Sequence, residues 1–121
     1  MFEDDYIMRI VKEMLRTVLR LIFKIDTEFP DEKMIENENA REIAEMLIKK
    51  VDEGHINEAE NELYDLMEDK TNDNLLIGLV FYSHLNELDE DFLLKNDFSQ
   101  EEIKDGLENL LSEFGIENII V

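Results

Sequence analysis

The sequence contains no cysteine, and this absence removes several classes of protein from consideration. Without thiols the chain forms no disulfide, offers no thiolate nucleophile and has no cysteine ligand for a structural zinc ion. Helix breakers are also scarce, with a single proline at Pro30 and four glycines in 121 residues. Because Glu, Leu, Ile, Asn and Lys dominate the rest, the composition favours long helices joined by short turns over strands.

Long apolar runs are missing as well. No stretch of about 18 uncharged apolar residues is present, so we expect no membrane span. The first residues, Phe2-Glu3-Asp4-Asp5, are acidic where a signal peptide carries basic residues. We therefore expect a cytoplasmic protein.

Positive charge is the third property in short supply. Lys and Arg number 12 against 32 Asp and Glu, which gives a formal net charge of −20. Such a surface repels nucleic acid and anionic lipid, and attracts basic proteins or cations. The hydrophobic content of 44% is sufficient for a core, so the charge does not indicate disorder. The length favours one domain over residues 1–121.

Apolar periodicity predicts an all-α fold with about five main helices and antiparallel helical hairpins. The helices are expected at residues 5–24, 39–52, 57–68, 75–85 and 100–114, with a short helical segment at 88–96. Asn39, Asn57 and Ser99 are the expected N-caps, because each precedes a helical pattern and Glu follows three residues later. Gly115 is expected to end the last helix in a Schellman motif with Ile116.

The predicted helix at 75–85 is apolar on nearly all sides, which is typical of a helix at the centre of a domain. Gly78 within it predicts the close approach of a neighbour, either the helix at 57–68 or the one at 5–24. The apolar tail Ile119-Ile120-Val121 is expected either to pack on the domain or to meet another chain.

The first predicted helix carries a basic stripe of Arg9, Lys12, Arg16, Arg20 and Lys24, whose spacing aligns them on one face. One interpretation is a solvent face that neutralises the acidic body through salt bridges. A second is a contact surface for an acidic partner or for another copy of the chain. A third, less favoured because the acidic body is repelled, is binding to an anionic membrane surface.

The same helix has apolar residues at heptad spacing, which allows a homodimer through this helix. The seam comprises Ile7, Val11, Met14, Val18, Leu21 and Ile25. It spans fewer than three heptads, so packing within the domain is the competing interpretation.

The central segment resembles one tetratricopeptide-type helical hairpin. The family has a glycine at the turn, an aliphatic or aromatic residue after it, then a small and a large apolar residue one turn apart. Here these are Gly54, Ile56, Ala59 and Leu63. Leu47 departs from the pattern, because the family prefers a small residue there. The resemblance implies close packing of two antiparallel helices around Ala59.

Most of the chain is also similar to a family of small acidic bacterial proteins known only as a domain of unknown function. The likeness lies in Asp4-Asp5-Tyr6-Ile7-Met8-Arg9, in Gly54-His55-Ile56-Asn57-Glu58-Ala59-Glu60-Asn61, and in Asn96-Asp97-Phe98-Ser99-Gln100-Glu101-Glu102-Ile103. It implies a helical, repeat-like fold and no activity.

Motifs of catalysis and metal binding are not found. His55 and His84 have no second histidine at ligand spacing, and the acidic turns at 69–74 and 89–91 lack the glycine and distant glutamate of a calcium loop. No phosphate-binding loop, nucleophile elbow or dinucleotide fingerprint is present. We therefore expect no enzyme, no catalytic residue, no cofactor and no metal.

The function class that remains is a cytoplasmic adaptor that binds an unidentified protein partner on a helical-hairpin surface. Nucleic acid is excluded as a partner on charge. The alternative is an acidic regulator that masks a basic protein surface in the manner of a nucleic-acid mimic. A less favoured alternative is a small-ligand or metal-binding protein whose site leaves no motif.

Overall fold

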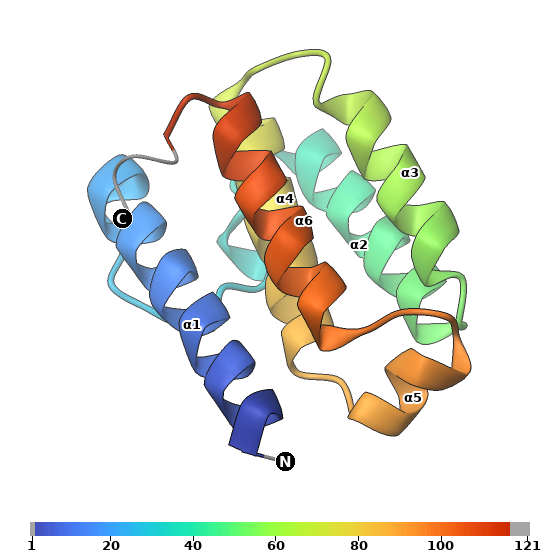
Figure 1. Cartoon of the computed structure of the whole chain (residues 1–121). Helices are drawn as coiled ribbons and strands as arrows, with labels where there is room; N and C mark the ends of the chain where they lie inside the picture. Colours follow the sequence, from blue (N-terminus) through green and yellow to red (C-terminus); the bar gives the residue numbers. More distant parts are fainter. Residues whose placement is uncertain (1, 117–121) are drawn as a thin grey trace.

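A computed structural model of the chain describes residues 2–116 and is all helical over that range (Figure 1). The prediction of an all-α fold with five main helices is confirmed, since five of the six α-helices are longer than two turns. The elements are α1 (Phe2–Val18), π-helical turn η1 (Leu19–Phe23), 3-10 turn η2 (Glu32–Met34), α2 (Glu38–Asp52), α3 (Ile56–Leu66), α4 (Asn72–Asn86), α5 (Glu90–Lys95) and α6 (Gln100–Glu113).

Helix α4 lies at the centre of the domain, as its apolar sequence predicts. It packs against α1, α2 and α6, and even Gly78 and Ser83 on it are buried. Helix α3 packs on α2, while α6 packs on both α4 and α1. In Figure 1, α6 lies in front of α4, and α3 lies at the right beside α2. Helices α3 and α6 do not pack directly on each other along their length.

The predicted helix ends are right in some places and wrong in others. Ser99 caps α6, because its hydroxyl accepts the Glu102 N–H at 3.2 Å. The Ile116 N–H donates to the Leu111 carbonyl at 2.9 Å, and Gly115 has φ +69°, so the Schellman ending is confirmed.

Helix α2 is capped by Asn37 and not by Asn39. The backbone of Asn37 is extended and its side chain accepts the Ala40 N–H at 2.9 Å, which places Asn39 inside the first turn. The prediction of Asn57 as the cap of the next helix is also wrong. Helix α2 ends at Asp52 and α3 begins at Ile56, so only Glu53, Gly54 (φ +93°) and His55 lie between the two helices, and Asn57 falls inside the first turn of α3.

The first helix is longer and less regular than the predicted 5–24. It begins at Phe2, and its α-helical hydrogen bonding changes after Val18 to the π-helical turn η1. Lys24 then takes a left-handed conformation at φ +61°, which ends the turn. The tail Ile119-Ile120-Val121, for which packing on the domain was one prediction, lies outside the described residues.

Gly78 does mark a close helix approach, but the neighbour is α6 and neither α3 nor α1. A Cβ atom at Gly78 would lie 2.6 Å from Cδ2 of Leu110. The reciprocal contact involves Gly106 of α6, where a Cβ atom would lie 2.6 Å from both Cε1 and the hydroxyl of Tyr82. Each helix therefore accepts a large side chain of the other at a glycine, which brings the two backbones together.

Candidate partner-binding groove

The basic stripe of α1 faces outward, and part of it is engaged by its own chain. The guanidinium of Arg16 pairs with Asp26 at 2.9 Å, which raises the pKa of Arg16 and lowers that of the Asp26 carboxyl. Lys12 lies 5.0 Å from the centroid of the Phe29 ring, and Lys24 donates to the Leu21 carbonyl at 3.2 Å. The loop after η1 therefore folds back along this face.

The two remaining members of the stripe, Arg9 and Arg20, are exposed. The geometry supports internal charge compensation as one role of the stripe. Its role as a contact surface for an acidic partner stays a prediction.

The heptad seam of α1 is mostly used inside the domain. Val11, Met14 and Val18 are buried in the core, against α4 and α6, the helices on which α1 packs. Leu21 is the member that remains exposed, at 45%. A homodimer through α1 stays a prediction. The buried seam residues Val11, Met14 and Val18 offer no surface to a second copy of the chain.

The hairpin residues lie where the sequence places them. Ile56, Ala59 and Leu63 are fully buried, and α3 packs on α2. The turn at Gly54 is tight, because a Cβ atom there would lie 2.6 Å from the Asn96 side-chain oxygen. The side-chain amide of Asn57 donates to the Asp97 carbonyl at 3.2 Å, so the turn is also fastened to the loop before α6.

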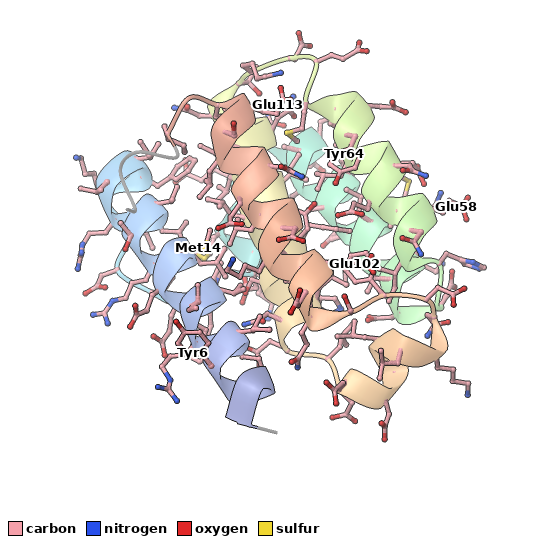
Figure 2. The ribbon with its side chains drawn as sticks, in the orientation of Figure 1. Tyr6, Met14, Glu58, Tyr64, Glu102 and Glu113 are labelled. Carbon is pink, nitrogen blue, oxygen red and sulfur yellow. The ribbon has the colours of Figure 1, made fainter. Side chains whose placement is uncertain are left out.

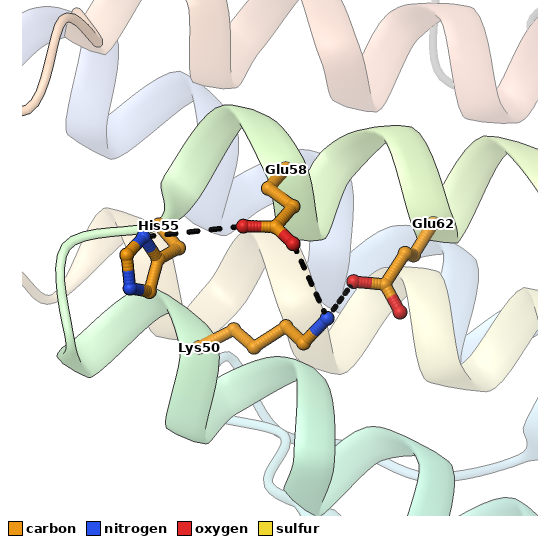
Figure 3. Close-up of polar contacts among 4 residues, drawn as sticks. All are labelled: Lys50, His55, Glu58 and Glu62. Carbon is orange, nitrogen blue, oxygen red and sulfur yellow. Dashed lines mark hydrogen bonds and ion pairs between the residues drawn. The ribbon is translucent and has the colours of Figure 1, made fainter.

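The outer face of the hairpin is held by an ion-pair cluster (Figure 3). Lys50 of α2 donates to Glu62 of α3 and lies 3.7 Å from Glu58, which also faces His55 at 3.9 Å. The hydrogen bond to Glu62 raises the pKa of Lys50. The second histidine, His84, pairs with Asp52 at 2.6 Å and ties α4 to α2. Both histidines thus have structural partners.

Residues 2–116 contain no group of three or more His, Asp and Glu side chains arranged to hold a metal ion. Within the same range, no helix is long and apolar enough to cross a lipid bilayer.

A groove of about 480 Å³ lies between α3 and α6. Its apolar part is formed by Leu63, Met67 and Leu110, and the ring of Tyr82 on α4 reaches it from below. Tyr64 and Glu113 lie on its two walls, on α3 and α6 (Figure 2). The remaining polar lining consists of Glu68, Lys70, Asn109 and Ser112. The lining thus combines an apolar floor with a polar rim.

A partly buried hydrogen bond lies beside the floor of the groove. The Tyr82 hydroxyl donates to the Glu60 carboxylate at 2.7 Å. Desolvation raises the pKa of Glu60, hydrogen bonding opposes that shift, and the charge of Glu102 on α6 adds to it. Burial and the neighbouring Glu60 charge also raise the pKa of Tyr82 far above its ordinary value, so this phenol stays protonated and remains a donor.

The opposite end of the groove is closed by Lys70. Its ammonium donates to the Met67 carbonyl, lies 3.6 Å from the Glu113 carboxylate and sits 5.9 Å from the centroid of the Phe114 ring. The groove therefore already holds one cation of its own chain between a carboxylate and an aromatic ring. A basic side chain is therefore compatible with the groups at this end of the groove.

Sequence reasoning did not find this groove. From the sequence pattern, Tyr64 and Glu60 belong to the solvent-facing side of α3. No residue near them in the sequence indicates that α6 lies opposite. Gly106 is the one signal that was available, because a glycine within an otherwise regular amphipathic helix indicates a close contact. None of the predicted contact residues lines the groove, since they lie on α1, on η1 or directly after η1: Arg9, Lys12, Arg16, Arg20 and Lys24.

No curated protein and no solved structure matches the chain. The resemblance to an uncharacterised domain family is confirmed by a match over residues 1–115. The chain belongs to the family of unknown function DUF6483.

Proposed function

We propose that this chain is a cytoplasmic, non-enzymatic interaction module whose α3–α6 groove receives a segment of a basic protein partner. The observation that carries the proposal is the groove itself, with Leu63, Met67 and Leu110 beneath a polar rim that includes the carboxylates of Glu68 and Glu113. Grooves between helices accept amphipathic segments by burying apolar anchors on the floor and meeting polar groups at the rim. The likeness of the α2–α3 hairpin to a tetratricopeptide unit belongs to this proposal, because such hairpins present one helix face to partners.

Charge complementarity selects the kind of partner. Glu68 and Glu113 line the groove, Glu60 and Glu102 lie beyond its Tyr64 end, and Lys70 is the cation in the lining. Since Lys70 is already paired with Glu113, the rim presents net negative charge to an incoming chain. The molecule as a whole, at −20, attracts the same partner over a longer range. A basic amphipathic segment therefore fits both the floor and the rim.

The test compares two variants that introduce the same bulk at two places. Asn109→Trp fills the groove, because Asn109 is an exposed residue of its lining. Asn61→Trp is the matched control, since Asn61 is exposed on α3 but lies outside the lining. Wild-type and variant proteins are used to capture partners from native lysate, and bound proteins are identified by mass spectrometry.

The proposal requires a basic partner that is captured by wild type and by Asn61→Trp and lost from Asn109→Trp. Circular dichroism must show unchanged helix content in both variants. A partner bound equally by all three proteins contradicts the groove as its site.

The second candidate function is an acidic regulator that masks a basic protein surface, and the net charge of −20 favours it. Long-range charge attraction is screened by salt, so capture by this mode collapses when the ionic strength is raised. It also does not depend on a single groove residue. Partners that disappear in high salt yet bind Asn109→Trp normally would support the regulator over the groove-binding module.

A further inference from the structure

Resting on the proposed function, the geometry points to Glu60 as the residue that anchors one basic side chain of the partner, an arginine or a lysine, beside Tyr64 and Tyr82. This assignment names a specificity-determining residue at the end of the groove away from Lys70. It follows from the partners of Glu60, its burial and the aromatic rings around it.

Glu60 differs from its neighbours on α3 in lacking a cation. Glu58 and Glu62, on the other side of the helix, share Lys50. Glu113 across the groove faces Lys70, and Glu108 on α6 faces Lys104. Among the described residues, no Lys, Arg or His side chain lies within ion-pair distance of Glu60, whose carboxylate accepts a hydrogen bond from the neutral Tyr82 phenol.

The carboxylate of Glu60 is also partly removed from water, although a partner can still reach it. Its residue is half-buried, and desolvation is the main cause of its raised pKa. A carboxylate in this position has lost hydration without gaining a counter-charge, so a cation brought to it by a partner gains more than it would at the open surface. Glu102 on the facing helix adds negative potential at the same place.

The aromatic surroundings suit a cationic side chain. Tyr64 is 43% exposed and lines the groove wall, while Tyr82 is fully buried and contacts Glu60 through its hydroxyl. A guanidinium or ammonium between the Glu60 carboxylate and the Tyr64 ring gains a charge-assisted hydrogen bond and cation–π attraction. The chain uses the same combination for its own Lys70, which lies between Glu113 and the Phe114 ring.

The conformation of Glu60 is prepared in advance. The Tyr82 hydroxyl holds the carboxylate, and the Tyr82 ring is itself packed against α6 at Gly106, where a Cβ atom would lie 2.6 Å from the ring. Little rotamer freedom is lost when a partner binds, which favours affinity and selectivity at this point.

The first test uses small probes of one side chain each. The full chain labelled with ¹⁵N is titrated with N-acetyl-arginine amide, with N-acetyl-lysine amide, and with N-acetyl-norleucine amide as the uncharged control. We expect the arginine or lysine probe to shift the amide signals of Glu60, Tyr64 and Gly106 more than norleucine does. The larger of the two responses identifies the preferred cation.

Glu60→Gln keeps an acceptor for Tyr82 but removes the charge, and Glu58→Gln removes a charge on the same helix from outside the groove. Loss of a charge-assisted hydrogen bond predicts about tenfold weaker probe binding in Glu60→Gln and little change in Glu58→Gln. Basic-probe binding that is equal in wild type and Glu60→Gln, or that is centred elsewhere on the molecule, would overturn the assignment.

The captured partner separates this inference from the proposed function. If capture depends on Asn109 but Glu60→Gln captures as well as wild type, the groove stands and the role of Glu60 is refuted. If capture is insensitive to Asn109→Trp, the proposed function fails, and the probe titration still decides whether Glu60 recognises a cation. Melting temperatures of both glutamine variants establish that each is folded.

Discussion

The ring of Tyr82 lies directly against Gly106, and a Cβ atom at residue 106 would sit 2.6 Å from the Tyr82 hydroxyl. The same hydroxyl donates to Glu60 at 2.7 Å, so Tyr82 connects three helices through one side chain. Gly106 supplies the space, α4 supplies the ring and α3 supplies the acceptor. The floor of the groove therefore depends on a residue that has no side chain.

Gly106→Ala is expected to destabilise the protein by roughly 1–3 kcal/mol, the usual penalty for overpacking. Helix propensity alone would favour alanine by about 1 kcal/mol, so a net loss shows that the contact with Tyr82 outweighs propensity. Urea unfolding followed by circular dichroism measures the difference. The control is Ser112→Ala on the exposed side of the same helix, which is expected to stay within about 0.5 kcal/mol of wild type.

The loss of stability in Gly78→Ala can be compared with the loss in Gly106→Ala. Its Cβ atom would meet Leu110 at 2.6 Å and 3.0 Å, but these are the terminal methyl carbons of a flexible side chain. Leu110 can move where the tethered Tyr82 ring cannot. We therefore expect a smaller loss of stability for Gly78→Ala than for Gly106→Ala, and the opposite order would contradict the account of Tyr82 as a fixed element.

Gly54→Val is expected to destabilise the protein by more than about 1 kcal/mol, because Gly54 has φ +93° and a β-branched residue is strained there. The added Cβ would also crowd Asn96. Gly54→Asn is the informative comparison, since asparagine tolerates a left-handed conformation better than valine. Thermal melts should rank wild type above Gly54→Asn and Gly54→Asn above Gly54→Val, and an unchanged melting temperature for the valine variant would refute the turn.

Local features of the fold were predictable because their causes are local. The cap at Ser99, the left-handed turn at Gly54 and the all-round apolar pattern of α4 each depend on residues within a few positions of one another. The errors have the same origin. Asn37 and Asn39 are equally good cap residues, and only the course of the preceding chain decides between them. The short link of Glu53, Gly54 and His55 likewise starts α3 at Ile56, which places Asn57 inside the helix and not at its cap.

The groove was not predictable, because it depends on which helices become neighbours. Glu60 and Glu102 lie on separate helices far apart in the sequence, and neither helix shows in its own pattern that it faces the other. The basic stripe was conspicuous because its residues share one helix. The loop that carries Asp26 and Phe29 covers part of the basic stripe and leaves less of it for a partner. No periodicity in the sequence indicates that this loop folds back over α1.

Ala59→Leu is expected to cost roughly 1–3 kcal/mol, because Ala59 is fully buried in α3 next to the α2 contact and added methyl groups have no space. Asn61→Leu on the exposed side of α3 adds a similar side chain without crowding the core. Melting temperatures of the two variants measure the difference. A stable Ala59→Leu protein would show that the two helices of the hairpin are not closely packed at this residue.

Glu60→Gln is expected to stabilise the protein at neutral pH. Desolvation raises the native pKa of Glu60, so the folded state binds a proton more tightly than the unfolded state does. Stability therefore falls as the pH rises from the unfolded carboxyl pKa, about 4.3, through the higher native value. Below that window Glu60 is protonated in both states, and glutamine brings little change. Above it the ionised carboxylate is disfavoured in the fold, whereas the glutamine amide oxygen still accepts from Tyr82.

The measurement is the melting temperature of wild type and Glu60→Gln across this pH range. The control is Glu45→Gln, which removes one negative charge at an exposed position of α2 and so accounts for relief of general repulsion. The gain from Glu60→Gln must exceed that of Glu45→Gln at neutral pH and must disappear in acid. A gain in stability of equal size at every pH would mean that the charge of Glu60 is not its cause. It would also contradict the desolvation of the Glu60 carboxylate, on which the proposed recognition of a basic side chain depends.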